Sequence, residues 1–198
     1  TTHGRPLAVA TGIALANPEL KVIVFTGDGD LGAIGGNHFI NACRRNADFT
    51  VFCVNNNIYG MTGGQASTCT PHGAMSTTTP HGNKDYPFDL SEIAVTAGAN
   101  YVARWTVRNV KQLIGSMKKA MKKEGFSFVE IISPCPTGFG RRNKMPQACQ
   151  LHEWIDIKTV KREKTETLGL DPVDINMEGN ITIGEFIERD RLPLRMVY

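Results

Sequence analysis

An acidic residue and an amide are spaced along this sequence as a site for a metal ion and a diphosphate requires. Asp28 follows an apolar run at residues 22–25, and Asn56 follows a second run at residues 49–54. Each run predicts a buried parallel strand, so both side chains should leave the same edge of one sheet, where open α/β sheets bind ligands. Amide and carboxylate oxygens are donors that Mg²⁺ prefers when it also holds phosphates. The spacing therefore predicts a cleft that holds a cation and a diphosphate.

Helical and strand-like patterns alternate along the chain, which predicts an α/β fold with a parallel sheet and helices on both faces. Helices are expected at residues 6–16, around 39–43, at 90–97 and at 110–121, and strands at 22–25, 50–54, 101–105, 126–132 and 180–186. Residues 62–84 are rich in Gly, Thr, Pro and His and predict a long loop, which at that length is usually functional or disordered. We expect a main domain over residues 1–150 and a short C-terminal extension over residues 151–198.

The composition argues against several classes of partner. Lys and Arg number 22 and Asp and Glu 19, and the net charge of +3 is too small to indicate a nucleic acid or an anionic membrane. No apolar run could span a bilayer and no signal-peptide pattern is present, so we expect a soluble, cytoplasmic protein. Five irregularly spaced cysteines argue against a disulfide framework and for a reducing compartment.

One stretch carries a specific resemblance to a known family: GDGDLGAIGGNHFINACRRNADFTVFCVNNNIYGMTGGQ, from Gly27 to Gln65. A GDG motif followed about 28 residues later by Asn is the signature of thiamine diphosphate enzymes. This version resembles the β subunit of 2-oxoacid:ferredoxin oxidoreductases, and most of all the 2-oxoglutarate branch. The segments THGRPLAVATGIALANPELKVIVF and ISPCPTGFGRRNKM also fit, whereas the chain after about Gln150 fits only in its TIGEF element. The resemblance implies a thiamine diphosphate-binding domain over residues 1–150 and, because Thr1 stands in mid-pattern, an incomplete N-terminus.

The resemblance also implies that this chain holds the diphosphate end of the cofactor. Asp28, the side chain of Asn56 and the main-chain carbonyl of Ile58 would bind Mg²⁺, which would neutralise phosphate oxygens that a carboxylate alone would repel. Further cofactor contacts are expected from Gly29, Asp30, Gly60 and Met61, with His3 as a weaker candidate. We assign no catalytic residue to this chain, because in the family the carboxylate that activates the aminopyrimidine ring comes from the partner α subunit.

Cys135 stands after the last expected strand of the main domain, in the tripeptide Ser133-Pro134-Cys135. A lone cysteine in such a place is more often a small buried residue. In the resemblance, this position carries the last of four thiolate ligands of a 4Fe-4S cluster, and the other three would precede Thr1. The remaining cysteines, Cys43, Cys53, Cys69 and Cys149, do not match the ligand positions of the family. We expect Cys135 to be a cluster ligand on condition that those N-terminal cysteines exist.

The implied activity is the oxidative decarboxylation of a 2-oxoacid, with 2-oxoglutarate as the best candidate. Carbon dioxide would leave, coenzyme A would take the acyl unit, and two single-electron transfers would reduce ferredoxin. The implied partners are the α subunit, ferredoxin, the 2-oxoacid and coenzyme A.

Two alternatives remain open at this point. Residues 27–32 also satisfy the G-x-G-x-x-G pattern of an NAD-binding Rossmann dehydrogenase. In that case Asp28 and Asp30 would face a pyrophosphate without a cation, and the ribose-binding acid expected after the next strand is missing. A non-catalytic assembly subunit would retain the fold without binding any cofactor.

Overall fold

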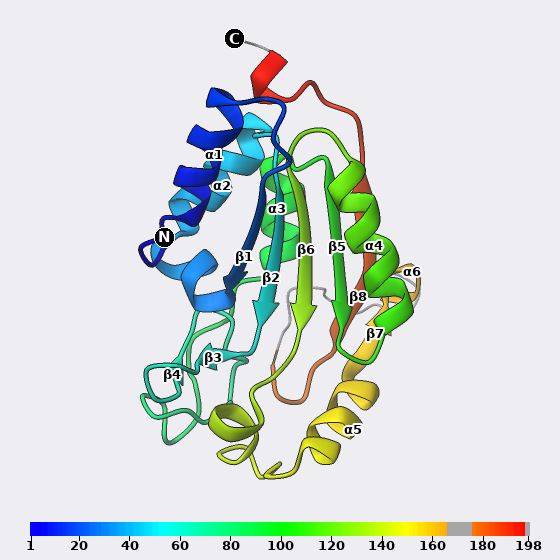
Figure 1. The fold of residues 1–198 in the computed structure, drawn as a ribbon. Coiled ribbons are helices and arrows are strands. Elements are labelled where there is room, and N and C mark those ends of the chain that lie inside the picture. The colour runs from blue at the N-terminus through cyan, green and yellow to red at the C-terminus, as the bar shows by residue number, and fades with distance from the viewer. Residues whose placement is uncertain (166–175, 197–198) are drawn as a thin grey trace.

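A six-stranded sheet forms the centre of the molecule, which the computed structural model describes for residues 1–165 and 176–196 (Figure 1). The strand order is β1-β2-β6-β5-β8-β7, and β3 and β4 form a separate pair. The strands are β1 (Ile23–Gly27), β2 (Thr50–Asn55), β3 (Ile58–Tyr59), β4 (Gln65–Ala66), β5 (Tyr101–Thr106), β6 (Ser127–Ile132), β7 (Thr159–Lys161) and β8 (Ile181–Glu188). The α-helices are α1 (Pro6–Ala16), α2 (Gly36–Arg45), α3 (Leu90–Ala97), α4 (Val110–Lys122), α5 (Ala148–Lys158) and α6 (Arg162–Thr165).

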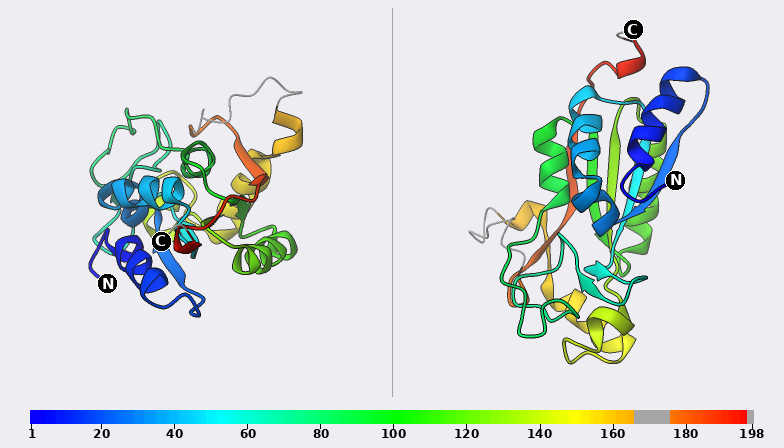
Figure 2. Two further views of the ribbon diagram at one scale, coloured as in Figure 1. Left: turned by 90° about the horizontal axis from the view of Figure 1, so that it is seen from above. Right: turned by 90° about the vertical axis from the view of Figure 1, so that its left-hand side faces the viewer.

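Strands β1, β2, β6 and β5 run parallel, which confirms the predicted α/β fold. Helices α2 and α3 cover one face of the sheet and α4 covers the other, while α1 lies beside β1 and packs on α2 (Figure 2). On the first face, the rings of Phe39 and Phe128 lie 5.1 Å apart between centroids. On the second face, Ala120 of α4 packs with Val129. Strands β5 and β6 are buried on both faces, as expected for the inner strands of a parallel sheet covered by helices.

Helix α3 shows how local signals define an element. The Asp89 side chain accepts a hydrogen bond from the Glu92 N–H at 2.8 Å and so caps the first turn. Gly98 ends the helix with a φ of +105°, a conformation that costs glycine little. These signals lie next to each other in the chain, and the helix predicted at residues 90–97 matches Leu90–Ala97.

The chain after residue 150 contributes strands to the main sheet. Helix α5 spans the expected domain boundary at residue 150, and the strand expected at 180–186 is β8. Strand β8 pairs antiparallel with β5, and β7 pairs with β8. Lys119 of α4 forms ion pairs with Glu185 and Glu188 of β8 at 2.8 and 2.7 Å. Residues 166–175 and 197–198 of the expected extension lie outside the described residues.

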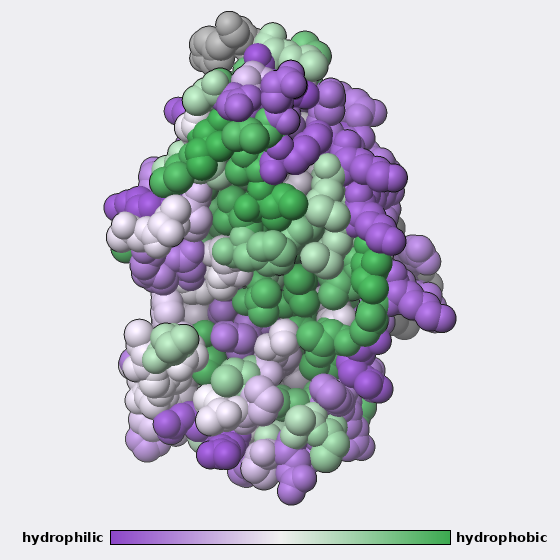
Figure 3. Space-filling view, in the orientation of Figure 1, coloured by the Kyte–Doolittle hydropathy of each residue, from purple (hydrophilic) through white to green (hydrophobic). Residues whose placement is uncertain are grey.

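The face that carries α4 is open over β1 and β2. Ile23, Phe25 and Val54 are exposed there, Phe25 to 67%, and the Phe25 ring lies 5.2 Å from that of Phe52 between centroids. Figure 3 shows apolar surface across this face of the molecule. Helices thus cover both faces as predicted, but their cover leaves an apolar surface beside α4.

The helices are short. The longest one in the described part of the chain, α4, has 13 residues. None of the helices in residues 1–165 and 176–196 combines the length and the apolar character needed to cross a membrane.

Candidate functional site

The carboxyl ends of β1 and β2 bring Asp28 and Asn56 together. Gly27 pairs with Val54 in the parallel register, so the two strands end at the same edge of the sheet. The Asn56 N–H donates to Asp28 Oδ1 at 3.4 Å, and the Ser67 hydroxyl donates to Oδ2. The Asp28 carboxylate therefore lies against the backbone of Asn56 at this edge of the sheet, and Asp28 is only 1% exposed.

The Asp28 carboxylate is a buried acid that suits a cation. Burial raises its pKa to about 6, although hydrogen bonds from Ser67 and from the Asn56 backbone oppose the shift. In residues 1–165 and 176–196 it has no ion-pair partner. A bound divalent ion would supply the missing positive charge and favour the ionised form. The environment of Asp28 therefore fits Mg²⁺.

A tight turn after β2 presents the other two expected ligands. Asn57 has a φ of +67°, in the left-handed region that asparagine tolerates. The Ile58 N–H donates to Asn56 Oδ1 at 3.1 Å, which leaves the second lone pair of that amide oxygen for a cation. In the described residues, no three His, Cys, Asp or Glu side chains gather as a metal site. A cation here would thus depend on amide and carbonyl oxygens besides one carboxylate.

Gly29 lies directly under Tyr59. The Tyr59 hydroxyl donates to the Gly29 carbonyl at 3.2 Å. A Cβ atom at position 29 would lie 2.2 Å from the Tyr59 ring, so only glycine permits this contact. The aromatic ring therefore forms one wall beside the GDG motif.

Asp30 ties the N-terminal segment to β1. Its carboxylate accepts hydrogen bonds from the Gly4 N–H and the Thr26 hydroxyl, each at 2.6 Å, and lies 2.7 Å from His3 Nδ1. His3 is half-exposed, and its ring centroid lies 6.2 Å from that of Tyr59. Both residues are thus beside the GDG motif, and Asp30 has partners on both of its oxygens. His38 lies elsewhere on α2, where its Nε2 is 3.0 Å from Arg5 Nη1.

Gly60 and Met61 follow β3 at the surface. A Cβ atom at Gly60 would lie 3.4 Å from Asn56 Nδ2, so Gly60 is close to the proposed ligand. The Met61 side chain is 100% exposed and extends into solvent. Of these two expected cofactor contacts, Gly60 thus lies next to Asn56, whereas the Met61 side chain points away into solvent.

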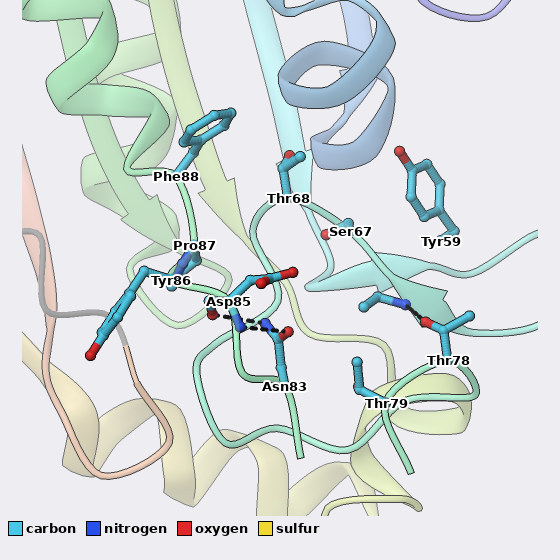
Figure 4. Close-up of a pocket in the computed structure, with 11 residues that line it drawn as sticks. Tyr59, Ser67, Thr68, Thr78, Thr79, Asn83, Asp85, Tyr86, Pro87 and Phe88 are labelled. Atoms are coloured by element: carbon cyan, nitrogen blue, oxygen red, sulfur yellow. Dashed lines mark hydrogen bonds between the residues drawn. The ribbon is translucent and has the colours of Figure 1, made fainter. Parts of the chain in front are cut away.

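A cavity of about 400 Å³, with both polar and apolar side chains in its wall, adjoins Asp28 through Ser67. Figure 4 shows Tyr59 on one side of this cavity and Tyr86 and Phe88 on the other. Hydroxyl and amide groups from the long loop also line it, namely those of Thr68, Thr78, Thr79 and Asn83. The loop predicted at residues 62–84 thus forms much of the wall of a cavity beside the candidate cation site.

Cys135 lies at the same edge of the sheet, after β6. Its N–H donates to the Asn56 carbonyl at 3.1 Å, and its Sγ accepts from the Gly138 N–H at 3.3 Å. Cys135 is only partly buried, unlike Cys43, Cys53 and Cys69. Cys43, Cys53 and Cys69 are buried, and burial raises the pKa of their thiols. The remaining cysteine, Cys149, is exposed on α5.

Ser67 and Tyr59 belong to the site but were not predicted from the sequence. Ser67 is 39 residues from Asp28 in the chain, and Tyr59 is 30 residues from Gly29. The hydroxyl-rich composition of the loop was the only local signal for Ser67, whereas Tyr59 stands beside the predicted ligand Ile58. Contacts of this range depend on how the loop packs, which local spacing does not encode.

Comparison with known proteins shows the family of this chain. Residues 1–131 match the family described as thiamine pyrophosphate enzyme, C-terminal TPP binding domain. The chain is 52% identical over 194 residues to 2-oxoglutarate synthase subunit KorB of Methanothermobacter marburgensis, covering 98% of this chain and 67% of that protein. It is 35% identical to the 2-oxoacid:ferredoxin oxidoreductase subunit beta of a Sulfolobus species, covering 100% of this chain and 64% of the relative.

A solved structure shares the fold. This is 2-oxoglutarate:ferredoxin oxidoreductase from Magnetococcus marinus, described with 2-oxoglutarate, coenzyme A and succinyl-CoA bound. The TM-score is 0.80 at 33% identity, and the match covers 98% of this chain and 65% of that one. The present chain thus spans about two thirds of the length of these relatives. None of these similarities supports the NAD-binding alternative.

The GDG motif at the end of β1, the asparagine turn at the end of β2 and these similarities agree with one another. The chain belongs to the β-subunit family of 2-oxoacid:ferredoxin oxidoreductases and contains a thiamine pyrophosphate-binding domain.

Proposed function

We propose that this chain is the subunit of a 2-oxoglutarate:ferredoxin oxidoreductase that binds the diphosphate end of thiamine diphosphate through Mg²⁺. The complete enzyme would convert 2-oxoglutarate, coenzyme A and two oxidised ferredoxins into succinyl-coenzyme A, CO₂, a proton and two reduced ferredoxins. One observation carries the proposal: Asp28 is buried without an ion-pair partner in the described residues, and it contacts the Asn56 turn. The names of the relatives at about half identity support 2-oxoglutarate as the substrate.

The residues of this chain would bind Mg²⁺ and orient the diphosphate of the cofactor. Asp28, Asn56 Oδ1 and the Ile58 carbonyl would hold Mg²⁺, whose charge would attract the diphosphate. The Tyr59 ring would cover the GDG motif and exclude water from it, since it lies against Gly29. When bound, thiamine diphosphate supplies the electron sink that decarboxylation of a 2-oxoacid needs.

Titration of the wild-type chain tests this proposal. We expect thiamine diphosphate and Mg²⁺ together to raise the melting temperature, while either alone has little effect, because each supplies the charge that the other needs. At about a hundredfold excess over the dissociation constant, binding adds roughly 2.7 kcal/mol to the free energy of unfolding. NAD, with or without Mg²⁺, should cause no shift. A shift with NAD alone would favour the dehydrogenase alternative, and no shift with any ligand would favour an assembly subunit.

Cys135 would supply one thiolate to a 4Fe-4S cluster. Its place next to Asn56 supports this role, because a cluster there would lie near the cofactor from which electrons leave. The Gly138 N–H also points at the sulfur, and hydrogen bonds to cluster sulfurs tune reduction potentials.

Replacing Cys135 in the complete subunit tests the cluster assignment. We expect Cys135→Ala to lower the iron content and the visible absorption, because soft thiolates hold such clusters. Cys149→Ala, which changes an exposed cysteine on α5, should leave both unchanged. Wild-type iron content in the Cys135 variant would show that this cysteine is structural.

The apolar surface over β1 and β2 supports assembly with a partner subunit. Exposed aromatic and aliphatic groups cluster there, Phe25 foremost, and an apolar patch of this kind marks an interaction site. We propose that the α subunit, which would also supply the activating carboxylate, is one partner, and ferredoxin another. Loss of co-purification with the α subunit in Phe25→Glu is the expected check, and unchanged co-purification would exclude this surface.

A further inference from the structure

We propose that Glu130 is a positioning residue for the cation site, because it orients the Asn55 amide that holds the Asn56 turn in shape. This inference rests on the proposed binding of Mg²⁺ by Asn56. It concerns residues that neither the sequence patterns nor the family resemblance assigned to the site.

Glu130 is a buried acid on β6 that serves only as an acceptor. Its side chain is 2% exposed. Oε1 accepts from Asn55 Nδ2 at 2.8 Å. Oε2 accepts from the Ser91 hydroxyl and from Arg104 Nε, each at 2.7 Å. Every one of these partners donates, so the arrangement suits a carboxylate and leaves no room for a donor at position 130.

The Asn55 amide is held from both sides. Its Nδ2 group faces Glu130, and its Oδ1 accepts from the Asn57 N–H at 3.1 Å. Since a backbone N–H can only donate and a carboxylate can only accept, a single orientation of the Asn55 amide satisfies both neighbours. Glu130 therefore decides which end of that amide points into the turn.

The turn held in this way carries the proposed cation ligands. Asn57 adopts its left-handed φ of +67° while its N–H is bonded to Asn55. Asn56 lies between these two residues, and its Oδ1 in turn accepts from the Ile58 N–H at 3.1 Å. Distortion of the turn would move the Asn56 amide and the Ile58 carbonyl together. Mutation of residues that support metal ligands through hydrogen bonds, without contacting the metal themselves, changes metal affinity by about tenfold to a hundredfold.

Replacing Glu130 by glutamine turns one acceptor oxygen into an NH₂ donor with almost no change of size. The glutamine oxygen must face Arg104 and Ser91, which both donate, so its NH₂ group must face Asn55. Asn55 then either meets a donor with its own NH₂ or flips and meets the Asn57 N–H with it. We expect Glu130→Gln to weaken Mg²⁺ binding in the presence of thiamine diphosphate by about tenfold to a hundredfold. In the cofactor-free protein, the backbone N–H of Asn57 should also exchange its hydrogen faster in this variant than in the wild type.

A second substitution should restore the pattern. In the double variant Glu130→Gln with Asn55→Asp, the new carboxylate accepts from Gln at 130 and from the Asn57 N–H. In this double variant, the Mg²⁺ affinity measured by calorimetry and the hydrogen-exchange rate of the Asn57 backbone N–H should return toward wild-type values. In the single variant Asn55→Asp, neither quantity should match the wild type. Glu185→Gln is the matched control, because Glu185 lies on β8 and bonds the Tyr101 hydroxyl and Lys119 instead.

Wild-type affinity and exchange in Glu130→Gln would overturn the inference. If that variant fails to fold, Asn55→Ala tests the inference instead. It removes the hydrogen bonds that join Glu130 to the turn and leaves Glu130 with Arg104 and Ser91. Unchanged Asn57 exchange and Mg²⁺ affinity in Asn55→Ala would overturn it as well. If the wild-type chain itself binds no Mg²⁺ with thiamine diphosphate, the proposed function fails. Hydrogen exchange of the Asn57 backbone N–H then still tests whether Glu130 and Asn55 hold the turn in shape.

Discussion

Replacing Asp28 with alanine is expected to abolish the joint stabilisation of the chain by Mg²⁺ and thiamine diphosphate. Among the residues that the structure describes, Asp28 is the one carboxylate proposed as a ligand of the cation, and without it only neutral oxygens of Asn56 and Ile58 remain for the metal. The whole cofactor-induced rise in melting temperature should therefore disappear. Thermal unfolding of both proteins, with saturating cofactor and metal, measures the effect.

A pH series with Asp28→Asn supplies the control. The pKa of Asp28 rises from 3.8 to about 6 on folding, so the folded protein binds the proton more tightly than the unfolded chain does. The free energy of unfolding of the cofactor-free chain should then fall as the pH rises from about 4 to about 6, by up to about 3 kcal/mol. Asparagine removes this fall, and Mg²⁺ binding to the wild type should strengthen over the same pH range. An unchanged cofactor shift in Asp28→Ala would contradict the assignment of Asp28.

Replacing Arg104 with methionine is expected to produce the largest loss of stability. Arg104 is 1% exposed on β5 and pairs with two buried acids, Asp89 and Glu130. Burial alone would lower the pKa of Arg104, but the two carboxylates raise it above its ordinary value. Methionine keeps much of the side-chain volume and leaves both acids without a cation, which costs about 3–5 kcal/mol. Urea unfolding at neutral pH measures the change.

Arg108→Met provides the matched control for that substitution. Arg108 pairs with Asp156 at 3.0 Å, but both side chains are about half exposed to solvent. Water already screens this pair, so the control should unfold at the wild-type urea concentration. If Arg104→Met also unfolds at that concentration, the buried pairs do not stabilise the fold.

Local sequence alone determined the strand ends that define the site. Parallel strands that are neighbours in a sheet end at one edge, so the apolar runs before Asp28 and Asn56 were enough to predict their proximity. Helix α3 was equally predictable, because Asp89 and Gly98 mark its ends within the local sequence. Periodicity and capping act over a few residues, so they can be recognised in the sequence without knowledge of how the rest of the chain folds.

Only the tertiary structure decided which distant groups complete the site. Ser67 reaches Asp28 across 39 residues and Glu130 reaches Asn55 across 75, and neither pairing has a local signature. Arg104 in a strand pattern gives no sign of burial, because its charge becomes tolerable only when Asp89 and Glu130 fold around it. The place of β8 beside β5 and the exposure of Phe25 likewise follow from how the sheet is assembled. Such contacts form between segments far apart in the chain, so they depend on packing and charge compensation that a one-dimensional pattern does not contain.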